Sequence, residues 1–244
     1  MGKNNAYESC CMRDVLGETL RPGGFILTDK AAEYCKLSKE SHVLDMGCGR
    51  GATVGHLFEK YGITAVGVDP SEKLLNEAKE RFDSDAFVLG RGENLPFEDG
   101  LFDCAIAECT LSLMDAHSAA AEAWRVLKKG GFFVVTDVYA KNSEAVGRLS
   151  SFPVNSCMRG LHDLTKLRSS LEQLGFTVEY FEECSQYLKE LVVRIGFSYG
   201  SMCEFWNMAS GSCINGEEFY GALKRCRPGY FMLIAKKGEK QNEQ

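Results

Sequence analysis

The sequence predicts an α/β protein whose core is a doubly wound, mostly parallel sheet of seven strands. Short apolar runs alternate with segments of helical periodicity through the middle of the 244-residue chain, and this alternation is typical of parallel strands joined by covering helices. A glycine-rich turn, Gly47-Cys48-Gly49-Arg50-Gly51, follows the first run, and the second run ends in Asp69. Such a sheet binds its ligand beyond the carboxyl ends of the strands, at the point where the strand order reverses.

Each core element has its own signal in the sequence. The first core helix should end near Gly62, because glycine is common just after a helix, and the Ser71 hydroxyl can cap the next helix. The segment 162–174 repeats leucine at helical spacing, and Gly175 ends it. The expected core strands are 41–46, 64–69, 86–90, 102–107, 132–139, 176–182 and 230–236, and the expected core helices are 52–61, 72–82, 116–127 and 162–174.

The remaining segments divide the chain further. Residues 1–38 are expected to form an N-terminal helical cap that contains a helix over 28–37. The core is expected over 39–183 and is completed by its final strand, 229–238. A helical insertion is expected over 184–228, and a disordered tail over 239–244. The insertion has helical patterns at 187–195 and 217–224. Its large side chains, which should line a ligand pocket or a homodimer contact, are Tyr199, Met202, Phe205, Trp206 and Met208.

Composition limits the partners of the chain. The formal net charge of −6 does not supply the basic field of a nucleic-acid surface, and no apolar run reaches the ~18 residues of a membrane span. The polar residues 1–10 lack the apolar core of a signal peptide, so a cytoplasmic location and a small-molecule partner are expected. The eleven cysteines should then be thiols, and without a Cys-x-x-Cys pair no metal site is expected.

Three features beyond the glycine spacing identify the nucleoside ligand, since the spacing alone also permits the dinucleotide site of a nicotinamide oxidoreductase. Asp45 lies just before the glycines, the run Gly90-Arg91-Gly92-Glu93-Asn94-Leu95-Pro96-Phe97 lies where the third strand should end, and Arg125-Val126-Leu127-Lys128-Lys129-Gly130-Gly131 precedes the fifth strand. In this order they resemble the class I S-adenosylmethionine-dependent methyltransferases, of the ubiquinone/menaquinone-biosynthesis type (methyltransferase type 11). The resemblance covers about residues 40–140. It implies a Rossmann-like methyltransferase fold and S-adenosylmethionine as the cofactor.

The resemblance also implies which residues hold the cofactor. Gly47 and Gly49 would line its methionyl part, with the Gly47 carbonyl meeting the ammonium group, and Asp69 would accept hydrogen bonds from the ribose hydroxyls. Gly92 and Glu93 would border the adenine, whereas Asp45 would mainly orient the glycine turn. The full expected set is Asp45, Gly47, Cys48, Gly49, Asp69, Pro70, Gly92, Glu93 and Glu108.

One residue departs from the family pattern. The position of Arg91 is commonly Asp, which binds the adenine amino group, but a guanidinium has donors only. Adenine would then be held by backbone groups or by Glu93. Glu108 and Asp137 follow the fourth and fifth strands, so Glu108 should lie at the pocket floor and Asp137 could face the acceptor; either could instead be structural.

The acceptor is expected to be a small molecule that is methylated by direct displacement. Positioning supplies much of the acceleration of such a reaction, and a base is needed only if the acceptor must lose a proton. The expected catalytic residues are Cys109, Cys157 and Glu108. In an alternative, soft thiolates hold arsenite or another metalloid, because Cys109, Cys157 and Cys10 or Cys11 resemble the cysteines of arsenite methyltransferases. A second alternative is a non-catalytic protein that binds S-adenosylmethionine and recruits a partner through its insertion.

Overall fold

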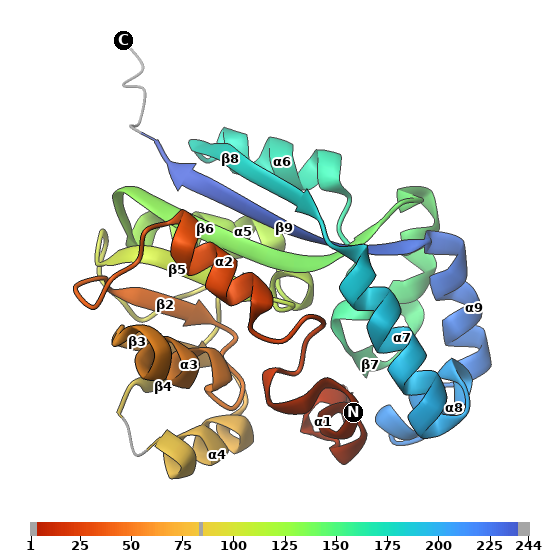
Figure 1. Ribbon diagram of the computed structural model, residues 1–244. Coiled ribbons are helices and arrows are strands. Elements are labelled where there is room, and N and C mark those ends of the chain that lie inside the picture. The colour runs from red at the N-terminus through yellow and green to blue at the C-terminus, as the bar shows by residue number, and fades with distance from the viewer. Residues whose placement is uncertain (1–3, 83–84, 239–244) are drawn as a thin grey trace.

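The computed structural model describes residues 4–82 and 85–238 and contains the expected seven-stranded sheet (Figure 1). The strand order is β4-β3-β2-β5-β6-β9-β8. The strands are β2 (Val43–Met46), β3 (Ala65–Asp69), β4 (Phe87–Leu89), β5 (Phe102–Glu108), β6 (Leu127–Ala140), β8 (Phe176–Glu183) and β9 (Pro228–Lys237). Only β9 runs antiparallel to its neighbours, β6 and β8, so the doubly wound, mostly parallel sheet is confirmed. The predicted tail, 239–244, lies outside the described residues.

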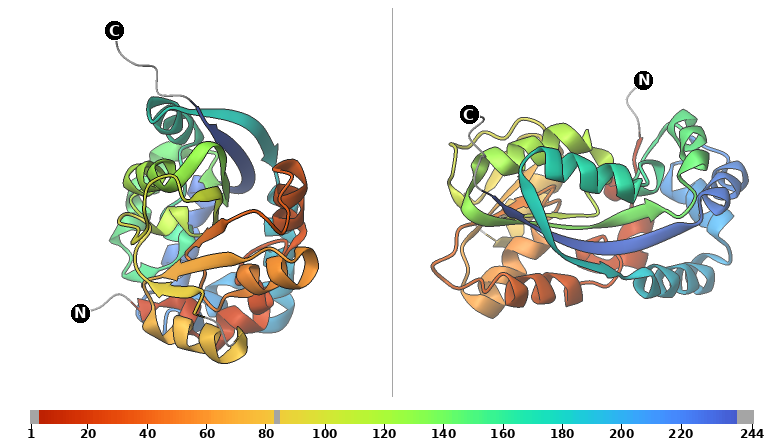
Figure 2. Two further views of the ribbon diagram at one scale, coloured as in Figure 1. Left: turned by 90° about the vertical axis from the view of Figure 1, so that its left-hand side faces the viewer. Right: turned by 90° about the horizontal axis from the view of Figure 1, so that it is seen from above.

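Helices cover both faces of the sheet, with α5 and α6 on one face and α2 and α3 on the other (Figure 2). The helices of the core are α2 (Ile26–Tyr34), α3 (Ala52–Tyr61), α4 (Glu72–Phe82), α5 (Ala116–Val126) and α6 (Leu164–Gln173). The strands feed two apolar layers with a period of two. In β5, Cys104 and Ile106 pack into the layer under α2 and α3, whereas Ala105 and Ala107 pack into the layer under α5.

The helix ends follow the expected chemistry, with two differences in the boundaries. The Leu74 amide donates to the Ser71 hydroxyl (3.3 Å), and Gly62 follows α3 with a φ of 66°. However, α2 ends at Tyr34 and not at residue 37, because Lys36 adopts a left-handed φ of 52°. In addition, β6 begins at Leu127, before the predicted start at residue 132, because Leu127 pairs with Phe102 of β5.

Segments from the two ends of the chain pack together beyond the carboxyl end of β6 (Figure 1). Here α1 (Cys10–Leu16) contacts α7 (Ser185–Tyr199) and α8 (Met202–Ala209), and α8 contacts α9 (Gly216–Cys226). A short parallel pair, β1 (Asn4–Asn5) with β7 (Val154–Asn155), joins the N-terminus to the segment after β6. The sequence patterns missed α8, which begins after a Ser201 cap. Within 4–82 and 85–238, no helix has the length and apolarity that a membrane span requires.

Candidate active site

The glycine turn after β2 is held by β3, where the strand order reverses. The amides of Gly47 and Cys48 donate to the Val68 carbonyl (2.7 and 3.0 Å), and the Gly49 amide donates to Asp69 Oδ2 (2.9 Å). Asp69 Oδ1 accepts from the Ser71 amide (2.8 Å). Asp69 therefore orients the turn. The expectation that Asp45 does so is wrong, because these turn amides already have partners on β3 and at its end.

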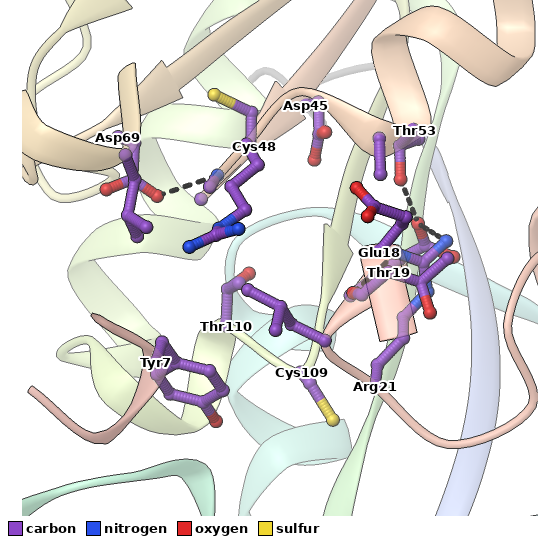
Figure 3. A pocket seen from close by; sticks show the side chains of 17 residues that line it. Tyr7, Glu18, Thr19, Arg21, Asp45, Cys48, Thr53, Asp69, Cys109 and Thr110 are labelled. Carbon is purple, nitrogen blue, oxygen red and sulfur yellow. Dashed lines mark hydrogen bonds and ion pairs between the residues drawn. The ribbon is translucent and has the colours of Figure 1, made fainter. Parts of the chain in front are cut away.

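A polar cavity lies against this turn (Figure 3). An outer cavity adjoins it and shares Gly47, Asp69, Leu74 and Thr110 with it. The expected cofactor residues divide between the two. The polar cavity is lined by Asp45, Gly47, Cys48, Gly49, Asp69 and Glu108, and the outer cavity by Gly47, Asp69, Pro70, Gly92 and Glu93. The fold thus brings every member of the expected set to one of two neighbouring cavities.

Close approaches explain why glycine occupies two of these positions. A Cβ on Gly47 would lie 2.5 Å from Thr110 Cγ2, at a φ of 90° that side chains rarely adopt. A Cβ on Gly92 would lie 2.5 Å from the Met114 sulfur. Packing against Thr110 and Met114 therefore leaves no room for a side chain at either position. Arg91 lines the outer cavity but is exposed.

Asp45 places a buried carboxylate at the edge of the polar cavity (Figure 3). The residue is only 3% exposed. Burial, reinforced by the neighbouring Glu108 carboxylate, raises the pKa of Asp45 to about 8, while Arg21 acts in the opposite direction. Such a carboxylate favours a cationic partner, which would stabilise its charged form.

Glu108 also lines the polar cavity, but its oxygens are engaged by the protein. Glu108 Oε2 lies 2.8 Å from Arg21 Nη2 and accepts from the Thr53 hydroxyl (2.9 Å), and Oε1 accepts from Thr28 (2.8 Å). These contacts anchor the N-terminal segment to the core and make Glu108 poorly placed to act as a base. The Nε–H of Arg21 is buried and has no hydrogen-bond partner among the described residues.

Asp137 has a structural position. Its carboxylate accepts from the amide and hydroxyl of Ser112 (both 2.8 Å) and from the Val138 amide (2.8 Å), and it lies 3.3 Å from His162 Nε2. It is fully buried and is not among the described residues that line these cavities. Asp137 therefore holds the short helix η3 (Leu111–Leu113), and the suggestion that it faces the acceptor is wrong.

A third, apolar cavity lies between the N-terminal segment and the insertion. None of the described residues that line it carries a charge. Its polar side chains are Cys109, Ser156, Cys157 and Trp206, and its apolar ones are Met12, Leu16, Leu20, Pro22, Val138, Met158, Leu188, Leu191, Val192, Ile195, Met202 and Phe205. The Trp206 Nε1–H is buried and has no partner among the described residues. Since Phe205 and Trp206 face this cavity and are buried, they do not supply a surface contact, and the homodimer stays a prediction.

The cysteines expected at the site divide into two groups. Cys109 and Cys157 are buried neighbours in the apolar cavity, and their hydrogen bond, together with burial, raises the pKa of the Cys109 thiol well above its ordinary value. Cys10 is exposed, and Cys11 interacts with Tyr199; neither is among the described residues lining the apolar cavity. The three-sulfur arrangement of the metalloid alternative is therefore not assembled.

Several residues of the site lay outside the sequence expectations. Tyr7, Leu20 and Arg21 come from the N-terminal segment, whose polar, irregular sequence carries no recognisable motif. Thr110 lines both the polar and outer cavities and directly follows Glu108-Cys109. The position of this residue after the fourth predicted strand was the one feature of the sequence that could have identified it.

Comparisons with known proteins agree with this geometry. A family described as a methyltransferase domain matches residues 44–135. An uncharacterized methyltransferase of Synechocystis is 32% identical over 157 residues, which cover 60% of this chain and 71% of the relative. A second curated relative, from Bacillus subtilis, is matched over 50% of its length.

Two solved structures show the same fold. The [4+2]-cyclase SpnF has a TM-score of 0.72 at 22% identity, with 96% of this chain and 93% of that chain covered. A phosphoethanolamine N-methyltransferase of Haemonchus contortus, in complex with S-adenosyl-L-methionine, has a TM-score of 0.74 at 20% identity, with 94% and 56% covered. At these identities the structures support the fold alone, whereas the relatives in sequence show the family. The chain belongs to the class I S-adenosylmethionine-dependent methyltransferases.

Proposed function

We propose that the enzyme transfers the methyl group by direct displacement to a neutral, largely apolar small molecule that binds in the apolar cavity. The uncharged lining of that cavity carries the proposal, because a charged acceptor would lose its hydration there without gaining a partner. The orphaned Trp206 Nε1–H would donate to one oxygen of the acceptor. The cofactor supplies a sulfonium methyl group that is open to displacement.

The polar and outer cavities would hold the cofactor. Asp45 and Arg21, which both line the polar cavity, would supply a carboxylate for the ammonium group and a cationic N–H donor for the carboxylate of the cofactor's amino-acid part. Each Asp69 oxygen already accepts one backbone amide, and the remaining lone pairs would accept from the ribose hydroxyls. Gly92 and Glu93 would border the adenine.

The residues around the acceptor would act by positioning. None of the described residues of the apolar cavity is a carboxylate, imidazole or amine that could serve as a general base. Cys109, whose thiol pKa is raised, would contact the acceptor as a neutral thiol, and Cys157 would contact the acceptor beside it. An acceptor atom that is nucleophilic without prior loss of a proton, or that ionises before binding, fits this site best.

The positions of the cysteines support metalloid methylation less well than they support methylation of a neutral organic acceptor. Two sulfurs meet at the cavity, and neither Cys10 nor Cys11 joins them. Arsenite remains a useful test compound because two neighbouring thiols alone can bind a trivalent arsenic centre.

The proposal is tested with methyl-tritiated S-adenosylmethionine and a panel of acceptors. Phenols, aromatic ketones and terpenoid alcohols represent the neutral class, and sarcosine, phosphoethanolamine and arsenite with thiol represent the others. We expect tritium in neutral products only. Transfer confined to the charged compounds or to arsenite would contradict the proposal.

Two adjacent valines of α7 provide matched variants. Val192 lines the apolar cavity and is 37% exposed, whereas Val193 does not line it and is 57% exposed. Val192→Asp should strongly lower methylation of the neutral acceptor and leave S-adenosylmethionine binding intact, because it places a charge on the wall of the acceptor site only. Val193→Asp should leave both unchanged. Equal effects of the two substitutions would exclude this cavity as the acceptor site.

A further inference from the structure

Two residues form the boundary between the polar cavity and the apolar cavity. Leu20 and Cys109 line both. Leu20 follows the short helix η2 (Gly17–Thr19) in the N-terminal segment, and Cys109 follows β5. The wall between the two cavities is therefore made where two distant parts of the chain meet.

Both boundary residues have a left-handed backbone, with φ of 53° at Leu20 and 57° at Cys109. A positive φ is unfavourable for a side chain with a Cβ, and such strain persists only where the surroundings enforce it. The other described non-glycine residues with a positive φ are Lys36, Ser212 and Arg227, and none of them lines the three cavities. At the site, the strain thus falls on the two residues of the shared wall.

A buried ion pair joins the neighbours of these two residues. Arg21 directly follows Leu20, and Glu108 directly precedes Cys109, and their side chains meet at 2.8 Å with 5% and 3% exposure. Arg21 also donates to the Thr19 carbonyl (3.3 Å), and the Cys109 amide donates to the Thr136 carbonyl (2.7 Å). The ion pair therefore clamps Leu20 and Cys109 at a fixed separation, with little freedom for either backbone.

We propose that Leu20 and Cys109 form the aperture through which the methyl group reaches the acceptor, and that the Arg21–Glu108 ion pair sets its width. The inference rests on the proposed function, in which the polar cavity holds the sulfonium end of the cofactor and the apolar cavity holds the acceptor. An aperture whose width is fixed in this way admits a methyl group and excludes a larger transferable group. Leu20 and Cys109 are then specificity-determining residues for the donor.

The test compares the binding of S-adenosylmethionine with that of S-adenosylethionine, which carries one more methylene on the sulfur, by isothermal titration. The wild-type protein should bind the ethyl compound at least ~10-fold more weakly, as expected when one methylene meets a closed pocket. Leu20→Ala opens the aperture and should lower the ratio of the two dissociation constants, ethyl compound to methyl compound, to about threefold or less. The affinity for S-adenosylmethionine itself should change less than the affinity for S-adenosylethionine, since Leu20→Ala removes no polar partner of the cofactor and gives space only to the larger group.

A second variant and two controls separate the aperture from general effects. Cys109→Gly removes the other side chain at a φ that suits glycine, and should also narrow the ratio. Leu16→Ala is the same truncation at a residue that lines the apolar cavity but not the polar one, so the ratio should stay at its wild-type value. Lys36→Gly relieves a left-handed φ far from the cavities and should also leave the ratio unchanged.

The outcomes are distinguishable. A wild-type ratio near one, or a wild-type ratio retained in both Leu20→Ala and Cys109→Gly, overturns the aperture and leaves the proposed function standing. An equal narrowing in Leu16→Ala also overturns it, because the discrimination would then belong to the apolar cavity as a whole. Failure of the wild-type protein to bind S-adenosylmethionine would overturn the proposed function, and the aperture with it.

Discussion

The polar cavity and the apolar cavity adjoin each other but are built in opposite ways. The polar cavity lies at the ends of β2, β3 and β5, and its glycine turn is held by hydrogen bonds to the neighbouring strand. The apolar cavity is enclosed by α1, α7 and α8, which pack side chain against side chain. The first is a consequence of the sheet topology, whereas the second depends on segments added outside it.

The two cavities also differ in how far the family match covers them. The family match, residues 44–135, contains the glycine turn, Asp69 and Cys109, but it contains no part of α1, α7 or α8. Substitutions that perturb one cavity at a time should show whether the other cavity responds.

The largest effect is expected from removing the clamp between the two cavities. Arg21→Met leaves the Glu108 carboxylate buried without its ion-pair partner, which should lower the free energy of unfolding by about 3–5 kcal/mol. Urea denaturation measures this loss. The double variant Arg21→Met/Glu108→Leu should recover most of it, because no buried charge remains. A single-variant cost below about 1 kcal/mol would mean that Glu108 gains another partner.

A smaller effect, confined to the polar cavity, is expected from Asp69→Ala. The substitution removes the acceptors of the Gly49 and Ser71 amides and those proposed for the ribose. We expect the dissociation constant for S-adenosylmethionine to rise about 100-fold, since hydrogen bonds to a charged group contribute about 1.5–3 kcal/mol each.

Binding of Nile red, an apolar dye, to the same variant measures the response of the apolar cavity. It should change by less than about threefold, because Asp69 lies outside that cavity. The exposed Glu98→Gln serves as the control for lost surface charge. Parallel loss of cofactor and dye binding in Asp69→Ala would show that the two cavities are coupled.

The buried Asp45 predicts a pH dependence of cofactor affinity. Its pKa of about 8 in the free protein means that a cationic ligand must displace a proton at neutral pH. S-Adenosylmethionine affinity should therefore rise by up to about tenfold per pH unit between pH 6 and pH 7.5. Isothermal titration across this range measures the slope, and Asp45→Asn should remove it. An unchanged slope in Asp45→Asn would assign the proton to another group.

The same carboxyl should affect the stability of the ligand-free protein with the opposite trend. Its folded pKa is raised above the ordinary value of 3.8, so the folded state binds the proton more tightly than the unfolded state. This contribution to stability is fully present below pH 3.8 and is lost as the pH rises through about 8. Urea denaturation at several pH values should show this decline, and Asp45→Asn should flatten it.

The smallest effect is expected from Trp206→Phe in the apolar cavity. Phenylalanine retains an aromatic ring against Phe219, whose centroid lies 4.8 Å from that of Trp206, but it removes the unpaired Nε1–H. We expect the KM for a neutral, oxygen-containing acceptor to rise about fivefold, the value of one hydrogen bond. The dissociation constant for S-adenosylmethionine should stay within about twofold of the wild-type value. A larger change in cofactor affinity than in acceptor KM would contradict the separation of the two cavities.

The sequence was sufficient for the part of the protein whose signals are local. Alternating apolar runs predicted the core strands, and Ser71 and Gly62 predicted helix ends. The glycine turn and Asp69 predicted where a nucleoside would bind, because the carboxyl ends of neighbouring parallel strands must meet at one edge of a sheet. Their meeting, with Asp69 bonded to the Gly49 amide at 2.9 Å, follows directly from that topology.

Tertiary structure decided the roles of residues whose partners lie far along the chain. Glu108 is engaged by Arg21, and Asp137 by Ser112 and His162; neither partnership could be deduced from spacing. The apolar cavity likewise depends on how α1 packs against α7 and α8. Contacts between segments that lie far apart in the chain leave no local signal, and for that physical reason the sequence predicted the glycine turn and Asp69 at the polar cavity, while only the folded molecule defined the apolar cavity.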